Sequence, residues 1–217
     1  MNINHHPDDS TLLSYAAGSL PESFDVVVAC HLQRCAHCHE KTFQAEAVAG
    51  QLLEALSNQA PSHSRAFRDD FFQKLEREPL PEPNTDLIDP RPETIPEAIH
   101  AILSGNSEDL PWKRLVPGMH SIALESSDGG LKLLRIAPGR NLPMHSHQGT
   151  ELTLVLQGAF QDELGCFNPG DVADLNHEVE HQPITIGNEA CICLVAMDAP
   201  LQFKGLVPKL LQPFIGF

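Results

Sequence analysis

The stretch GRNLPMHSHQGTELTLVLQG, residues 139–158, carries the strongest fold signal in this 217-residue chain. In a β-strand, successive side chains point to opposite faces, so His145 and His147 share one face and Glu151 has the same parity. Such a segment can direct two imidazoles and a carboxylate into the interior of a β-barrel. These side chains are common ligands of divalent metals. The stretch therefore predicts a β-rich fold with an internal metal site.

Short segments of β-type sequence surround this stretch between residue 97 and residue 217. Turn sequences such as DGG, APG and NPGD separate them, and their residues are apolar, β-branched or alternating in polarity. The segments read HSIALES, LKLLRIA, ELTLVLQG, AFQDEL, QPITIG and CICLVAM. Many short, evenly spaced strands are typical of a β-sandwich or barrel. We therefore predict an all-β barrel over residues 97–217.

Residues 1–77 show helical patterns instead. The segment DDSTLLSYAAG combines capping residues with a stop at Gly18, and LPESFDVVVACHL places Pro21 where a second helix begins. The segments CHEKTFQAEAVAGQLLEALS and SRAFRDDFFQKLERE repeat apolar residues at intervals suited to a third and a fourth helix. Residues 78–96 are dense in proline and acidic residues, which is typical of an extended linker. We predict an all-α four-helix domain that this linker isolates from the barrel.

A second cluster of metal ligands lies in ACHLQRCAHCHE, residues 29–40. His31, Cys35 and Cys38 have the spacing H-x3-C-x2-C, and a CxxC turn brings two sulfur atoms to one edge of a tetrahedral zinc ion. A fourth ligand must come from His5, His6, His37 or His39 in this region. We favour His6, because ligation there would attach the N-terminal segment to the second and third helices. Cys30 lies one residue off the ligand face and is predicted to be a buried thiol.

Two alternatives remain for this cluster. The thiols and imidazoles could be free surface groups, or Cys35 and Cys38 could be a redox pair of the thioredoxin type, although the βαβ context of that fold is missing. A structural metal is favoured on energetic grounds. A small helical domain has a thin core, and zinc contributes about 10–16 kcal/mol of apparent folding free energy in zinc-finger peptides.

These motifs resemble the ChrR family of bacterial anti-sigma factors. His6 with H31-x3-C35-x2-C38 is similar to its zinc-binding anti-sigma domain, and G139-x5-H145-x-H147-x3-E151-x6-G158 matches the first cupin motif. The resemblance spans nearly the whole chain. It implies that residues 1–77 wrap a sigma factor of the extracytoplasmic-function group and block its access to RNA polymerase. It also implies a cupin barrel (double-stranded β-helix or jelly roll) that responds to singlet oxygen or related oxidative stress.

The same resemblance points to the last ligand of the cupin site. His181 in EVEHQP follows the PGD turn at residues 169–171 much as in the second cupin motif of the ChrR family. The general motif is not met strictly, so His177 remains an alternative. Three histidines and Glu151 suit zinc, manganese, iron or nickel, and the ChrR resemblance implies zinc. Cys191 and Cys193 share one strand face and are either buried packing residues or a thiol pair near the site.

The charge and apolar content of the chain restrict its partners. A net charge of −15 disfavours direct contact with nucleic-acid phosphates and favours a basic protein partner. The N-terminal sequence MNINHHPDDS lacks the features of a signal peptide, and the longest apolar run, residues 190–197, is too short to cross a bilayer. We therefore expect a cytoplasmic protein without membrane association. The apolar tail LQFKGLVPKLLQPFIGF could cover the barrel, dock on the helices or form a homodimer interface.

The fourth helix offers a surface for a partner. Phe67, Phe71, Phe72 and Leu75 form an apolar face that either packs inside the helical domain or binds a sigma factor. The competing function is a metal-dependent cupin enzyme, such as a dioxygenase or isomerase, with an accessory zinc domain. A catalytic cupin has no need of a separate acidic helical domain, and no general base or cluster of substrate-binding arginines stands out near the ligands. We therefore expect a regulator and no enzyme.

Overall fold

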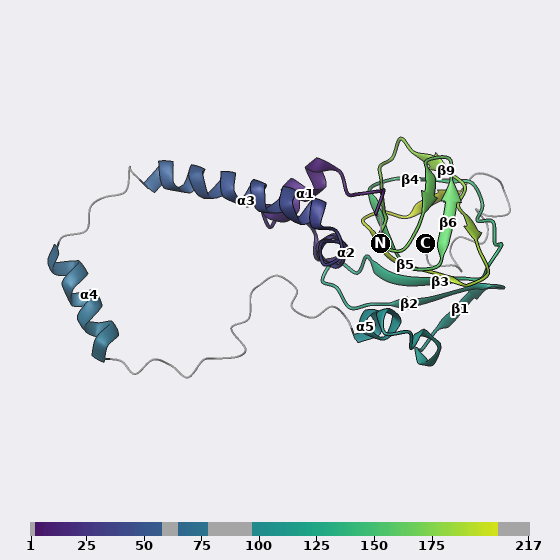
Figure 1. Ribbon diagram of the computed structural model, residues 1–217, viewed down its shortest axis with the longest axis horizontal. Helices are drawn as coiled ribbons and strands as arrows, with labels where there is room; N and C mark the ends of the chain where they lie inside the picture. Colours follow the sequence, from purple (N-terminus) through teal and green to yellow (C-terminus); the bar gives the residue numbers. More distant parts are fainter. Residues whose placement is uncertain (1–2, 58–64, 78–96, 204–217) are drawn as a thin grey trace.

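The computed structural model describes residues 3–57, 65–77 and 97–203, and its helices and strands follow the two predicted halves (Figure 1). The N-terminal region contains α1 (Asp9–Ala16), α2 (Glu22–Leu32), α3 (Ala36–Ser57) and α4 (Arg65–Arg77). A further helix, α5 (Glu97–Leu103), and the short 3-10 helix η1 (Ser107–Asp109) precede the strands. The sequence analysis missed α5, which lies at the start of the region predicted to be all-β. Among the described helices, none is both long and apolar enough to cross a bilayer.

Local sequence explains where the first helices begin and end. After α1, Gly18 adopts a φ of +63°, and the Ser19 N–H donates to the carbonyl of Ser14, which closes the helix as expected of a glycine C-cap. Pro21 immediately precedes α2, where its missing N–H costs no helical hydrogen bond. The segment VVVACH makes α2 apolar around most of its circumference, and such a helix must be buried on several sides.

Within residues 97–203, the second half forms twelve strands in three sheets. Six strands form a sheet in the order β1-β2-β3-β11-β5-β8, and two three-stranded sheets have the orders β10-β6-β7 and β12-β4-β9. Neighbouring strands in these sheets pair antiparallel. The bounds are β1 (Lys113–Val116), β2 (Met119–Ala123), β3 (Leu131–Ile136), β4 (His145–His147), β5 (Glu151–Gln157), β6 (Ala159–Asp162), β7 (Gly165–Phe167), β8 (Val172–Leu175), β9 (Glu180–His181), β10 (Ile184–Ile186), β11 (Cys191–Met197) and β12 (Leu201–Phe203).

The central strands β5 and β11 of the six-stranded sheet are buried on both faces. Along β11, the side chains of Cys191, Cys193 and Val195 enter a cluster with Phe160 and Phe167 of the second sheet. The alternate residues of β11 pack on the opposite face with apolar residues of α2 and α5, in the cluster that contains Ile192, Leu194, Ala196, Val27, Val28 and Ile99. An apolar residue is thus required at every position of β11, which explains the continuous run CICLVAM.

The helical region docks directly on the cupin-like sheet, so the expectation that the linker isolates the two halves is wrong. Helix α2 contacts β11 and β5, and one hydrophobic cluster includes residues of both halves. Polar contacts add to it. The Asp128 carboxylate accepts hydrogen bonds from the backbone N–H and the hydroxyl of Ser23, and Asp174 accepts from the N–H of Asp8 and the hydroxyl of Thr11. The free energy gained by burying apolar surface at this interface exceeds the entropy that the two halves would keep if only a flexible linker joined them.

The predicted fold class is confirmed: a helical N-terminal region precedes a cupin-like β-region, here built as three sheets. Helix α4 lies within the predicted segment SRAFRDDFFQKLERE and is one residue shorter at each end, and its described side chains are exposed. The linker at residues 78–96 and most of the apolar tail fall outside the described residues. The division into residues 1–77, 78–96 and 97–217 therefore remains a prediction.

Candidate functional site

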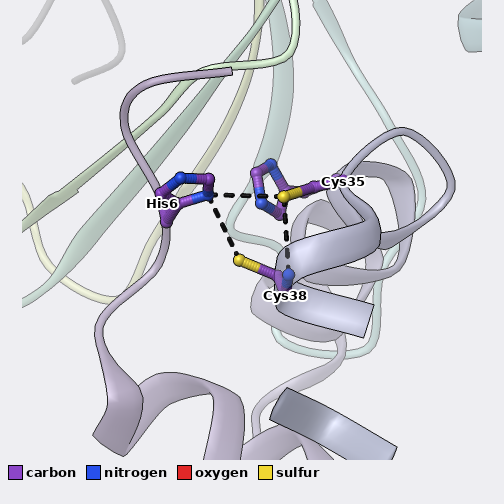
Figure 2. A group of neighbouring side chains, drawn as sticks. His6, Cys35 and Cys38 are labelled. Carbon is purple, nitrogen blue, oxygen red and sulfur yellow. Dashed lines mark hydrogen bonds between the residues drawn. The ribbon is translucent and has the colours of Figure 1, made fainter. Parts of the chain in front are cut away.

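Four predicted ligands of the first site lie together in the helical region. His6 precedes α1, His31 lies near the end of α2, Cys35 precedes α3, and Cys38 lies in its first turn. One ligand atom from each lies within 4.8 Å of the others. Figure 2 shows His6 facing the two sulfur atoms, and its Nδ1 lies 3.4 Å from the Cys35 Sγ and 3.3 Å from the Cys38 Sγ. A tetrahedral zinc ion places sulfur and nitrogen ligands about 3.5 Å apart, so this spacing fits zinc.

His31 carries the clearest sign of an absent binding partner. Its Nδ1 donates a 2.9 Å hydrogen bond to the carbonyl of Gly170, and its Nε2 is buried with no hydrogen-bond partner among the described residues. A buried polar atom without a partner is rare and costly. Burial also lowers the pKa of His31, which favours the neutral imidazole that binds metals. The Nε2 lone pair of His31 is therefore available to a cation in this cluster.

The environment of Cys38 also fits a metal ligand better than a free thiol. Burial, with a smaller contribution from the nearby Cys35 sulfur, raises the pKa of Cys38 to about 12. A neutral Cys38 thiol is poorly suited to redox attack, which requires a thiolate, whereas a bound cation would favour the thiolate form. The rival histidines lie outside the ligand group, although the His37 ring is 5.2 Å from that of His6. His37 and His39 are exposed, and the His5 ring stacks on Phe167 at 4.1 Å.

The second cluster lies inside the cupin-like half. His145 and His147 both project inward from β4, and His181 reaches them from the paired strand β9. The Nε2 of His181 lies 2.9 Å from that of His145 and 3.3 Å from that of His147. Two nitrogens bound to one metal at 2.0–2.1 Å lie about 2.9–3.4 Å apart. The structure brings His181 into this group and leaves His177 exposed outside it.

Hydrogen-bond partners of these histidines hold their ring orientations. The Nδ1 of His181 lies 2.8 Å from a carboxylate oxygen of Asp162, whose side chain is fully buried, and the Nδ1 of His145 donates to the Pro143 carbonyl. Such partners orient a ring so that the other nitrogen faces the metal. Burial, with the neighbouring histidines, lowers the pKa of His145 and of His147 to about 4, so both rings are neutral near pH 7. Sequence reasoning missed Asp162, because nothing in its local pattern marks it.

Glu151 lies beside the three histidines and outside their closest group. One carboxylate oxygen is 3.4 Å from Nδ1 of His147, and the other accepts a hydrogen bond from the Thr153 hydroxyl at 2.8 Å. Burial raises the pKa of Glu151, which favours the neutral acid when no cation is bound. A metal bound by the histidines would instead favour the ionised form of Glu151 and attract its carboxylate.

The remaining buried thiols lie apart from the ligand groups. Cys30 is in the core of α2, and burial raises its pKa to about 12, as expected of a packing residue. Cys191 and Cys193 share one face of β11, and their sulfur atoms are 3.6 Å apart. Both side chains lie in the apolar cluster between the sheets.

The helical region also presents a large exposed apolar surface. Phe67, Phe71, Phe72 and Leu75 on α4 are each more than half exposed, so none is buried as bundle packing requires. Helix α3 contributes Phe43, Val48, Leu52, Leu53 and Leu56, which are at least as exposed. A hollow of about 480 Å³ between α1, α2 and α3 opens beside Phe43. Exposed apolar residues in such number indicate a surface that a partner covers.

Known proteins share this architecture and much of this sequence. The family model described as "ChrR Cupin-like domain" matches residues 102–200. The anti-sigma-E factor ChrR of Cereibacter sphaeroides is 38% identical over 215 residues, which cover 99% of each chain. In the crystal structure of Rhodobacter sphaeroides SigE in complex with the anti-sigma ChrR, the matching chain is 36% identical, with a TM-score of 0.68 over 91% of this chain and 100% of that chain. This chain belongs to the ChrR family of anti-sigma factors.

Proposed function

We propose that this protein sequesters a sigma factor of the extracytoplasmic-function group and releases it under oxidative stress. The observation that carries this proposal is the full-length match to an anti-sigma-E factor. This match spans both the helical ligand cluster and the cupin-like half, so the proposal does not depend on either part alone. Because a sigma factor acts on RNA polymerase in the cytoplasm, this protein acts there too.

The exposed apolar faces of α3 and α4 form the sigma-binding surface in this proposal. Phe67, Phe71, Phe72 and Leu75 supply aromatic and aliphatic anchors of the kind that dominate binding energy at interfaces. The net charge of −15 complements a partner whose own surfaces bind nucleic acid. By covering the nucleic-acid-binding surfaces of the sigma factor, this protein would block access of the sigma factor to polymerase and DNA.

His6, His31, Cys35 and Cys38 hold a structural zinc ion in this proposal. Four protein ligands fill a tetrahedral site and leave no open position for a substrate, which is typical of structural zinc. The ion would join the N-terminal segment, α2 and α3 at one point. Helix α3, which carries part of the apolar surface, would thereby be held in a fixed direction relative to α2 (Figure 1).

His145, His147 and His181 hold the second metal, with Glu151 as the completing carboxylate. When bound, the metal supplies a localised positive charge in a buried, apolar part of the protein. The imidazoles bind through Nε2, and Asp162 and the Pro143 carbonyl keep two of the rings in the required tautomer. We propose that this site is needed for the response to singlet oxygen or peroxide, and zinc is the expected ion.

Metal analysis combined with sigma capture tests the proposal as a whole. The full chain, purified from a bacterial host that coexpresses the cognate sigma factor, should contain two equivalents of metal and should copurify with that sigma factor. Zinc at both sites is expected. Iron in the protein together with no retained sigma factor would instead support a cupin enzyme.

Replacing His145 and His147 by Ala should separate inhibition from response. We expect the double variant to lose one metal equivalent and to keep the sigma factor inhibited, because the first ligand cluster is intact. A sigma-dependent reporter should then fail to respond to singlet oxygen or peroxide. His177→Ala is the matched control, since this exposed histidine lies outside the cluster.

Two outcomes of that experiment would contradict the division of roles. Normal induction in the double variant would show that the cupin metal is not required for the response. A reporter that is active without stress would show that the cupin metal helps to hold the sigma factor.

A further inference from the structure

One turn of the cupin-like half lies against the ligands of the helical half. This docking turn, residues 168–172, connects β7 to β8, and it is joined to β5 because Gly170 N–H donates to the Val155 carbonyl and Val155 N–H donates to the Asp171 carbonyl. Gly170 has a φ of +97°, and a Cβ there would meet the Ile3 side chain at 2.9 Å. The backbone conformation at this position therefore favours glycine, and the absence of a side chain leaves room for Ile3 of the N-terminal segment.

The first contact from the docking turn determines the tautomer of His31. A carbonyl oxygen can only accept a hydrogen bond, so the 2.9 Å contact with Gly170 requires the proton on Nδ1 of His31. The Nε2, which is buried and has no hydrogen-bond partner in the described part of the chain, then carries the lone pair and lies in the ligand cluster. A residue of the β-region, 139 positions along the chain, thus orients a ligand of the helical region.

The second contact holds the segment that carries His6. Asp171 is completely buried, and one of its carboxylate oxygens accepts hydrogen bonds from the N–H groups of Asn4 at 2.6 Å and His5 at 3.0 Å. The Val172 N–H donates to the His5 carbonyl at 3.1 Å. These bonds determine the backbone position of the residue that immediately precedes His6. The other Asp171 oxygen accepts from Asn168 N–H and holds the docking turn itself.

We propose that the docking turn positions His6 and His31 for zinc, so that zinc binding and the docking of the two halves are one coupled equilibrium. Removing the partners of metal ligands typically lowers metal affinity by about 10–100-fold. Coupling between two binding events is reciprocal, so loss of zinc must also weaken the contact of the N-terminal segment with the turn. This inference rests on the zinc site proposed above.

Asp171→Asn in the full chain tests the positioning role. We expect a zinc affinity about 10–100-fold below that of the wild type, measured by chelator competition. Asp128→Asn is the matched control, because Asp128 also joins the halves through a carboxylate but holds Ser23, away from the ligands. The control should keep a zinc affinity close to that of the wild type, because the hydrogen bonds of Asp128 to Ser23 lie outside the docking turn through which the coupling acts.

Cobalt substitution supplies a readout that a general loss of stability would not reproduce. Absorption from thiolate-to-cobalt charge transfer reports the cysteine-containing site. The d–d bands of tetrahedral cobalt should change in Asp171→Asn in the same way as in His6→Ala, while Asp128→Asn should keep the wild-type spectrum.

Hydrogen exchange tests the reciprocal effect without changing the turn. In Cys38→Ser, the Val172 amide should exchange at least about 10-fold faster, while amides of the β6–β10 pairing, away from the helices, should be unchanged. Wild-type zinc affinity in Asp171→Asn, or unchanged exchange at Val172 in Cys38→Ser, would overturn the coupling. Absence of zinc from the first site of the wild-type protein would instead overturn the site itself.

Discussion

Cys38→Ser is expected to remove one zinc equivalent and to abolish tight sigma binding. The variant loses one of two sulfur ligands, so its zinc affinity should fall by more than the roughly 10–100-fold that loss of a ligand's hydrogen-bond partner costs. Without the ion, the N-terminal segment, α2 and α3 lose their common attachment point, and α3 no longer presents its apolar face in a defined direction. Metal content of the purified protein and titration with the sigma factor measure both effects.

Cys30→Ala is the matched control for this substitution. Cys30 is a buried cysteine of the same region, and it packs in the core outside the ligand group. The control should keep its zinc and its sigma affinity, at a stability cost of about 1 kcal/mol for the lost side-chain volume. Tight sigma binding by a zinc-free Cys38→Ser protein would refute the structural role of the metal.

The second large effect is expected from charges placed in the apolar face of α4. Phe67→Asp combined with Phe71→Asp should raise the Kd for the sigma factor by at least about 100-fold, because each anchor residue of an interface contributes about 2 kcal/mol or more. Both side chains are more than half exposed, so the folded state of the free protein should be little affected. Binding is measured by titration, and folding by circular dichroism.

Gln73→Asp controls for the added negative charge on the same helix. Residue 73 lies on the opposite side of α4 from Phe67 and Phe71, by the 3.6-residue period of the helix. This variant should bind the sigma factor with an affinity close to that of the wild type. Equal binding by the double variant and the wild type would place the sigma contact elsewhere, for example on the exposed residues of α3.

The ligand spacings were readable from the sequence because they depend on local geometry. Alternation along a strand places His145 and His147 on one face, and the H-x3-C-x2-C spacing brings His31, Cys35 and Cys38 to one end of α3. Helix ends at Gly18 and Pro21, and most strands, follow from equally local preferences. His6 was inferred from its place before α1 and His181 from family resemblance, and the structure brings each of them into the expected group.

The contacts between the halves were decided by the tertiary structure. The hydrogen bonds from His31 to Gly170 and from His5 to Asp171 join residues 139 and 166 positions apart, and no local pattern encodes such pairs. The same is true of Asp162, which reaches His181 only because the sheets pack together. The sequence does indicate that both faces of β11 are covered, because every residue of the run CICLVAM is apolar. The identity of that cover, helix α2 on one face and the second sheet on the other, depends on how distant surfaces fit, which only packing of the complete chain determines.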